Sequence, residues 1–307
     1  MHRESRAMGS RLALTLAGAL DDGTGEAAWG MVRDEFEATE RALSRFRPES
    51  ELSILNGRAG DGEFVAVGER LWACLAASRR AHRISDGRFD PRVITVLETI
   101  GERAGVPLAA TRSASAQRPF VELDPRQRRI RLWHPVDSGG IGKGLALRWS
   151  AARLQSRWPD AAYLLEAGGD VVVHGRPPHA GAWHIAVEDP HGAPDPVAVL
   201  AVERGAVVTS SIAVRHWLDG AGRPVHHLID PRTGAPADSG LASVTVAALD
   251  PAWAEVWSKA LFLAGTRGIG PEARARGLAA WWVDAEGGLG MTPAARALTT
   301  WSRGMKP

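Results

Sequence analysis

Residues 226–234 read HHLIDPRTG, which places an imidazole and a carboxylate three residues apart before a Pro–Gly turn. An imidazole titrates near neutral pH and can take a proton from a hydroxyl, and a nearby carboxylate can anchor the reacting group. A lone His–Asp pair is more often structural. Two adjacent histidines before this turn nevertheless favour a reactive site with a general base.

A second candidate is the glycine-rich segment 137–144 (DSGGIGKG), which directly precedes a predicted helix over 143–158. Glycines let backbone N–H groups approach a phosphate, and a helix N-terminus favours an anion. Lys143 would add a point charge. The segment is not a Walker A loop, because the GxxxxGK[ST] spacing is absent and Gly144 stands at the Ser/Thr position. A plain strand-to-helix turn explains the segment equally well.

Three further segments are weaker signals when each is taken alone. Residues 166–170 (EAGGD) lie between two predicted strands, where Asp170 could orient a hydroxyl or a backbone amide, although a plain hairpin is the favoured interpretation. Asp90 precedes Pro91 in 85–91 (SDGRFDP), a typical turn, and 206–211 (AVVTSS) reads as a strand that ends in three hydroxyls.

The elements that must position these residues follow from apolar periodicity. Val32, Phe36 and Leu43 mark one face of a helix. Helices are predicted over 26–45, 67–84, 143–158 and about 252–264, and strands over 12–16, 163–165, 171–173, 184–187, 197–202, 207–209, 243–247 and 279–283. Helices early and antiparallel-looking strands late predict an α+β fold with mixed, mainly antiparallel sheets and flanking helices.

Composition narrows the classes of function. A chain of 307 residues holds one large domain or two interlocked ones. The formal charge of +2 without basic runs gives no electrostatic footprint for nucleic acid. Cys74 is the single cysteine, which excludes an intramolecular disulfide and a cysteine metal cluster, and its apolar setting predicts a buried core thiol.

The N-terminal region indicates whether the protein is expected to be secreted or to stay in the cytoplasm. The apolar stretch at 12–20 is interrupted by Thr15 and Gly18, and its alternation fits a first strand better than a secretory segment. No apolar run approaches the roughly 20 residues that span a bilayer. We therefore expect a cytoplasmic protein without a transmembrane segment.

Taken in order, these segments resemble the motifs of the ApbE family, the flavin transferases that move FMN from FAD to proteins. The matching segments are 8–10 (MGS), 44–46 (SRF), 50–56 (SELSILN), 86–91 (DGRFDP), 137–144 (DSGGIGKG), 168–170 (GGD), 209–211 (TSS), 227–234 (HLIDPRTG) and 254–259 (AEVWSK). The resemblance covers 8–265 and implies one ApbE-like domain over 1–307, in which FAD lies in a groove between two interlocked halves.

The resemblance also implies an activity and a set of site residues. FMN would pass from the substrate FAD to a Ser or Thr hydroxyl of a target flavoprotein, and AMP would leave. His227 matches the base for the acceptor hydroxyl. Phe46 matches an aromatic ring against the adenine, where Phe can replace Tyr because both have a π-face. The positions that match flavin or nucleotide contacts are Met8, Phe46, Arg88, Phe89, Asp90, Asp137, Lys143, Gly169, Asp170, Thr209 and Ile229.

The implied metal site is where this sequence departs most from the family. The resemblance implies Mg²⁺ near the pyrophosphate, held by the Gly140 carbonyl and by an Asp and a Thr of a late helix. Glu255 stands at the Asp position and Lys259 at the Thr position. Hard cations want oxygen ligands, which an ammonium lacks, and the i,i+4 spacing favours an ion pair. Either Glu255 and Ser258 hold Mg²⁺ while Lys259 points away, or the ammonium replaces the metal.

Smaller departures are Ser211 for a Gly, Arg92 for a Thr and Glu166 for an Asn. Two alternatives to flavin transfer therefore remain. One is an FAD pyrophosphatase that gives FMN and AMP. The other is a non-catalytic FAD-binding protein with an altered metal site.

Overall fold

The computed structural model describes residues 1–18, 21–101 and 119–304. The chain forms two compact units, and it crosses from one to the other several times. The first unit comprises Met1–Phe36, Lys143–Arg215 and Asp238–Pro307, and the second comprises Glu37–Gly142 and His216–Ala237. The two units are therefore interlocked along the sequence, and the assignment of one domain to 1–307 stays a prediction.

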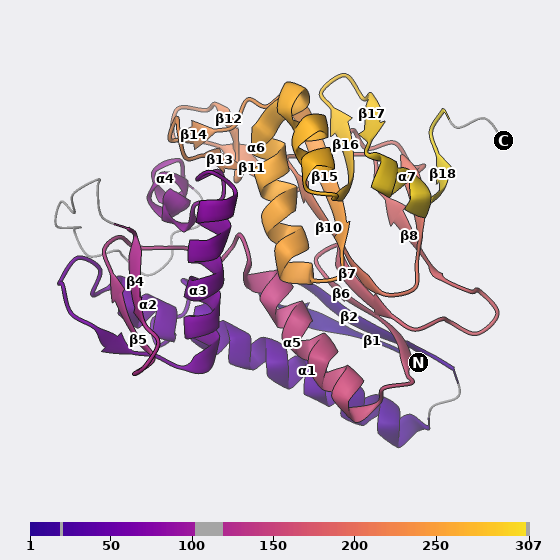
Figure 1. Cartoon of the computed structure of the whole chain (residues 1–307), viewed down its shortest axis with the longest axis horizontal. Coiled ribbons are helices and arrows are strands. Elements are labelled where there is room, and N and C mark those ends of the chain that lie inside the picture. Colours follow the sequence, from indigo (N-terminus) through magenta and orange to yellow (C-terminus); the bar gives the residue numbers. More distant parts are fainter. Residues whose placement is uncertain (19–20, 102–118, 305–307) are drawn as a thin grey trace. The chain divides into compact units, whose positions relative to one another are not determined.

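The first unit is built on an antiparallel sheet in the order β1-β2-β6-β7-β10-β15-β16-β17 (Figure 1). Its strands are β1 (His2–Ala7), β2 (Ser10–Ala17), β6 (Ala162–Ala167), β7 (Asp170–His174), β10 (Gly205–Ser211), β15 (Leu241–Ala248), β16 (Ala279–Asp284) and β17 (Leu289–Met291). This sheet confirms the predicted α+β class with mainly antiparallel pairing.

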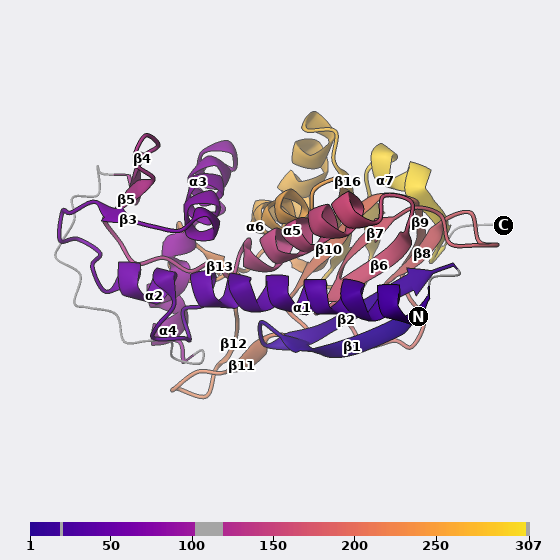
Figure 2. The same cartoon turned by 90° about the horizontal axis from the view of Figure 1, so that it is seen from below.

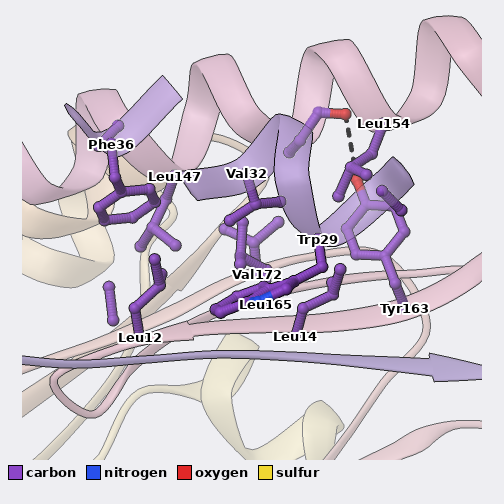
Figure 3. Packing of buried hydrophobic residues seen from close by; sticks show 14 of the residues in the cluster. Leu12, Leu14, Trp29, Val32, Phe36, Leu147, Leu154, Tyr163, Leu165 and Val172 are labelled. Carbon is purple, nitrogen blue, oxygen red and sulfur yellow. Dashed lines mark hydrogen bonds between the residues drawn. The ribbon is translucent and has the colours of Figure 1, made fainter. Parts of the chain in front are cut away.

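One face of this sheet is covered by α1 (Asp22–Leu43, of which the part up to Phe36 belongs to this unit) and α5 (Gly142–Arg157) (Figure 2). Val32 and Phe36 of α1 are fully buried against strand residues such as Leu14. Figure 3 shows this core, in which the Tyr163 hydroxyl donates to the carbonyl of Ala151 at 3.3 Å. The apolar periodicity of α1 therefore predicts its buried face correctly.

The opposite face packs against a smaller sheet, β18-β9-β8, and a short helix. These elements are β8 (Trp183–Val187), β9 (Ala198–Val202), α7 (Pro293–Leu298) and β18 (Thr299–Ser302). Successive side chains of β7 point to opposite faces of the sheet. Val172 packs in the core under the helices, whereas Val171 and Val173 pack in the core under the smaller sheet.

Helix α6 (Pro251–Ala275) packs on β10, β15 and β16. Asp250 caps it, because the Asp250 carboxylate accepts from the backbone N–H groups of Ala252 and Trp253. Gly265 has φ 70 and ψ 176, so the regular helix breaks there. The predicted helix over about 252–264 corresponds to the part before this break.

The second unit holds short elements connected by turns. Its helices besides the end of α1 are α2 (Glu51–Asn56), α3 (Glu69–Ile84), the 3₁₀ helix η1 (Pro91–Val93) and α4 (Ile94–Thr99). Its strands are β3 (Val65–Ala66), β4 (Val121–Asp124) and β5 (Arg129–Leu132) in the order β3-β5-β4, with the pairs β11 (His216–Leu218)–β12 (Pro224–His226) and β13 (Ile229–Asp230)–β14 (Ala235–Pro236).

Two further expectations have outcomes in the structure. Cys74 lies on the buried face of α3, as its apolar setting predicts. Over the described ranges, no helix combines the length and the apolar character that crossing a membrane requires.

Candidate active site

In the second unit, the glycine-rich segment is held against the Phe-Asp-Pro motif. The Asp137 N–H donates to the carbonyl of Pro91 at 2.8 Å. A Cβ added to Gly140 would lie 2.8 Å from the ring of Phe89, which is buried. Two of the motifs that the sequence singled out are therefore in direct contact, and residue 140 must stay small for the ring to pack there.

Two hydrogen-bonding residues fix the segment further. The Asn56 side chain pairs with the backbone of Val136 in both directions, donating at 2.9 Å and accepting at 3.0 Å. The Ser138 hydroxyl donates to the carbonyl of Leu43, at the end of α1, at 2.7 Å. Because a backbone donor and acceptor are both satisfied by one buried amide, Asn56 gives the SELSILN motif a structural role.

Arg45 joins two of the expected nucleotide-contacting residues. Its side chain is only 4% exposed, and its Nε lies 3.5 Å from Asp137 Oδ1. A second contact of 3.4 Å reaches Glu98. The Arg45 guanidinium also lies 4.4 Å from the ring centroid of Phe46, which is 42% exposed. This cation–π contact orients an aromatic ring that solvent reaches.

Asp90 positions the turn after Phe89. Its carboxylate caps η1 by accepting from the Arg92 N–H, and it binds the Arg92 guanidinium through both oxygens at 2.5–3.0 Å. Arg92 stands where the resemblance has Thr. Its guanidinium neutralises the mostly buried carboxylate of Asp90, which explains the Arg at this position. His82 Nδ1 lies 3.7 Å from the same carboxylate.

Arg88 and the histidine motif also come together in the second unit. Arg232 donates to both oxygens of Asp230, and this hydrogen bonding, with a smaller contribution from the charge of Arg88, lowers the pKa of Asp230. The carboxylate of Asp230 therefore holds Arg232, and its expected role as an anchoring acid stays a prediction. Ile229 is buried beside it in β13.

The two histidines differ in their surroundings. His226 Nδ1 accepts from the Leu228 N–H at 3.2 Å, which leaves Nε2 to donate to the carbonyl of Ala237 at 3.2 Å. Burial lowers the pKa of His226, so the neutral form is favoured. His226 therefore shapes the turn. His227 follows the end of β12 and is half-buried, and its role as general base stays a prediction.

The first unit contributes a partly buried ion pair at the start of α5. Lys143 Nζ lies 2.5 Å from Asp170 Oδ2, and Asp170 Oδ1 accepts from the Thr209 N–H at 3.2 Å. Burial alone would lower the pKa of Lys143, but the Asp170 carboxylate, with that of Glu255 behind it, outweighs burial and raises the pKa. Asp170 thus orients a backbone amide, one of the two roles that the sequence left open.

Two tight turns lie side by side in this unit. Gly168 and Gly169, with φ of 60 and 88, connect β6 to β7 as the favoured hairpin interpretation expects. Met8 has φ 48 in the turn between β1 and β2, a conformation that non-glycine residues adopt rarely. A Cβ on Gly168 would lie 2.8 Å from the Cβ of Ser10, so the two turns touch.

The side chains of the expected metal ligands Glu255 and Ser258 are bonded to other protein groups. Glu255 Oε1 accepts from Lys259 Nζ at 3.2 Å, and Oε2 accepts from the Gly144 N–H at 2.8 Å. The Ser258 hydroxyl donates to the Glu255 carbonyl and bonds the Ser210 hydroxyl at 2.7 Å, fully buried. Protein groups thus occupy these oxygens, and the residues present do not fit a Mg²⁺ site. The ion pair that the i,i+4 spacing predicts is present.

Residues 8–282 match the sequence model of the ApbE family. The chain belongs to the ApbE family.

Similar proteins include a FAD:protein FMN transferase of Klebsiella pneumoniae, 25% identical over 298 residues, with 92% of this chain and 84% of that protein covered. A FAD:protein FMN transferase of Treponema pallidum is 29% identical over 252 residues, covering 74% and 68% of the two chains. Among solved structures, the ApbE protein of Thermotoga maritima matches with a TM-score of 0.87 at 25% identity, covering 98% of this chain and 99% of that one.

The remaining departures from the ApbE motifs are explained locally. Ser211 replaces a Gly, but its φ is not positive, so a side chain is tolerated, and its hydroxyl bonds the backbone of Ala242. Glu166 forms a two-oxygen ion pair with Arg11 across neighbouring strands at 2.9–3.1 Å. Each of the two side chains is thus paired within the first unit.

The expected ApbE site residues thus fall into two groups, one in each unit. The second unit contains Phe46, Arg88, Phe89, Asp90, Asp137, Gly140, His227 and Ile229, and the first contains Met8, Lys143, Gly169, Asp170, Thr209, Glu255, Ser258 and Lys259. Sequence reasoning missed Arg45 and Asn56. Arg45 lies in the matched segment 44–46 and Asn56 in the matched segment 50–56, so the motif match itself could have indicated both residues.

Proposed function

We propose that this chain transfers FMN from FAD to a Ser or Thr hydroxyl of a target flavoprotein and releases AMP. Membership of the ApbE family supports the proposal, as do relatives named FAD:protein FMN transferase that match over as much as 92% of this chain. The observation that carries it furthest is the Arg45 contact with both Phe46 and Asp137, because it links an exposed aromatic ring with the glycine-rich segment.

The proposed reaction is a displacement at phosphorus. The acceptor hydroxyl oxygen forms a bond to the phosphorus of the FMN half, and the bond from that phosphorus to the AMP oxygen breaks. The hydroxyl proton passes to His227, and AMP carries away the electron pair of the broken bond. The step needs no oxidant or reductant, and its atoms balance.

The chain's own residues supply positioning and charge. Phe46 offers a π-face to the adenine, which stacking recognises without hydrogen bonds. Lys143 keeps its proton at neutral pH, because the charges of Asp170 and Glu255 raise its pKa, so it can present a positive charge to a phosphate. His227, half-buried beside the structural His226, is the proposed base.

Mass spectrometry tests the proposal. The purified chain is incubated with FAD and an extract of the cell that makes it, and digested proteins are searched for Ser or Thr peptides that have gained FMN less one water. We expect such peptides, with AMP formed in equal amount, and none with heat-denatured chain. FMN and AMP without modified peptides would instead indicate an FAD pyrophosphatase, and FAD binding without AMP would indicate a binding protein.

A further inference from the structure

A cluster of two buried carboxylates and two partly buried lysines lies at the start of α5 in the first unit. It consists of Lys143, Asp170, Glu255 and Lys259. All four carboxylate oxygens of the cluster accept a protein donor. The pairs are Asp170 Oδ1 with Thr209 N–H, Asp170 Oδ2 with Lys143, Glu255 Oε1 with Lys259, and Glu255 Oε2 with Gly144 N–H, at 2.5–3.2 Å.

These contacts leave few oxygens for a metal. Mg²⁺ takes six oxygen ligands, several of them water, and is usually anchored to the protein by one or two carboxylates. Here each oxygen of both carboxylates already accepts a protein donor, which a metal would have to displace. The Ser258 hydroxyl is fully buried and bonded to Ser210.

The same contacts hold the Lys259 side chain at a more exposed position than its partner carboxylate. The Lys259 side chain is 19% exposed, whereas that of its partner Glu255 is 1% exposed. The Lys143 side chain is 28% exposed and that of Asp170 is 3% exposed. Both ammonium groups of the cluster are therefore more exposed than both carboxylates, an arrangement that suits an anionic ligand.

We propose that the Lys259 ammonium, held by Glu255, supplies the charge that a divalent cation would otherwise bring to the nucleotide, so that FAD binds this chain without metal. The inference rests on the proposed function for the identity of the nucleotide. A metal entering the cluster would meet like-charge repulsion from Lys259 and would have to displace a donor from a buried carboxylate. The Lys259 ammonium, which Glu255 already holds, supplies positive charge without this repulsion and without displacing a donor.

The first measurement uses the metal alone. Binding of Mn²⁺, a spectroscopic stand-in for Mg²⁺, is followed by electron paramagnetic resonance in the wild type and in Glu255→Asp/Lys259→Thr, which supplies a shorter carboxylate and a hydroxyl. We expect no stoichiometric Mn²⁺ binding by the wild type at millimolar concentration and a gain of binding in the double variant. Stoichiometric Mn²⁺ binding by the wild type would overturn the proposal.

The second measurement is the FAD dissociation constant with excess Mg²⁺ and with chelator, at one ionic strength. For the wild type we expect the two values to agree within about twofold, and for Lys259→Met a loss of about tenfold or more in both conditions. Lys259→Arg, which keeps the charge, should retain affinity, and Arg267→Met, an exposed cation elsewhere on α6, is the matched control.

The outcomes separate the two proposals. A wild type that loses FAD affinity on chelation, or a folded Lys259→Met that binds FAD as well as the wild type, would overturn the role of Lys259 but leave FMN transfer intact. A wild type that binds no FAD in either condition would instead refute the proposed function. Circular dichroism of each variant establishes folding. If Lys259→Met does not fold, Mn²⁺ binding by the wild type and its FAD affinity with and without chelator still decide the question.

Discussion

Gly144 lies against the backbone of Ala252: a Cβ added at residue 144 would be 2.5 Å from the Ala252 Cα and 2.7 Å from the carbonyl oxygen of Pro251. Backbone atoms cannot swing aside as a flexible side chain can. The Gly144 N–H also donates to Glu255. Residue 144 therefore sets how closely the start of α5 approaches the start of α6, and with it the position of the neighbouring Lys143.

Gly144→Ala tests this approach. We expect the substitution to lower the free energy of unfolding by roughly 1–3 kcal/mol, because the two helix starts must move apart. Differential scanning calorimetry measures the fall in melting temperature. Gly30→Ala is the matched control, since a Cβ there meets nothing within 4 Å in the middle of α1, and helix propensity predicts a gain of up to ~1 kcal/mol. Equal effects of the two substitutions would contradict the close approach.

Phe46→Ala tests the proposed adenine platform. The ring is 42% exposed and lies under the Arg45 guanidinium, so its removal should weaken FAD binding by roughly 1–3 kcal/mol, the scale of one stacked base. Binding of FMN, which has no adenine, should change little. Calorimetric titration with both flavins gives the comparison, and Trp301→Ala removes another exposed aromatic ring as a control. A wild type with equal affinity for FAD and FMN would count against the platform.

His227→Ala tests the proposed base. Transfer of FMN should fall by about 10²–10⁴, the usual contribution of a positioned base, while FAD affinity stays near the wild-type value. Rates of acceptor modification and FAD titration separate the two effects. His226→Ala should instead lower stability, because its imidazole bonds Leu228 and Ala237. Loss of transfer in a stable His226→Ala would show that the two histidines have been assigned the wrong roles.

Elements with a regular apolar period could be predicted from the sequence, including the five-residue strands β7, β8 and β9, whereas elements too exposed or too short to show a period could not. Helices α1, α3 and α5 were predicted within a few residues because each buries a continuous apolar face. Strand β1 was missed because its residues, HRESRA, are mostly exposed and show no apolar alternation. The strands β3, β13 and β14 have two residues each, which is too few for a period to appear.

The candidate site could likewise be predicted only in part from the sequence. Motif order indicated which segments matter, but the partners depend on contacts between residues far apart in the chain. Asn56 bonds Val136 across 80 positions, and Gly144 bonds Glu255 across 111. No local pattern encodes such pairs. The i,i+4 pair of Glu255 and Lys259 could be predicted, since helix geometry alone brings those two positions together.

The last prediction concerns pH and the structural histidines of the second unit. Burial lowers the pKa of His226, and burial together with the charge of Arg92 lowers the pKa of His134. In the unfolded chain both histidines titrate at about 6.5. As the pH falls below that value, the unfolded chain takes up protons that the folded chain does not. Stability should therefore fall on acidification, until the pH passes the lowered folded pKa values, by up to about 1.4 kcal/mol per pH unit for each histidine.

His226→Gln isolates one of these contributions, because the glutamine amide can still donate to the carbonyl of Ala237 but does not titrate. Denaturant unfolding at about pH 7.5 and about pH 5.5 gives the loss of stability on acidification for each variant. We expect a smaller loss in His226→Gln than in the wild type, and an unchanged loss in His184→Gln, whose histidine is exposed on β8. Carboxylates with lowered pKa values, such as Asp230, also lose their contribution on acidification, but only below about pH 4, outside this window. A loss in His226→Gln as large as that of the wild type would mean that His226 does not carry the acid sensitivity of this unit.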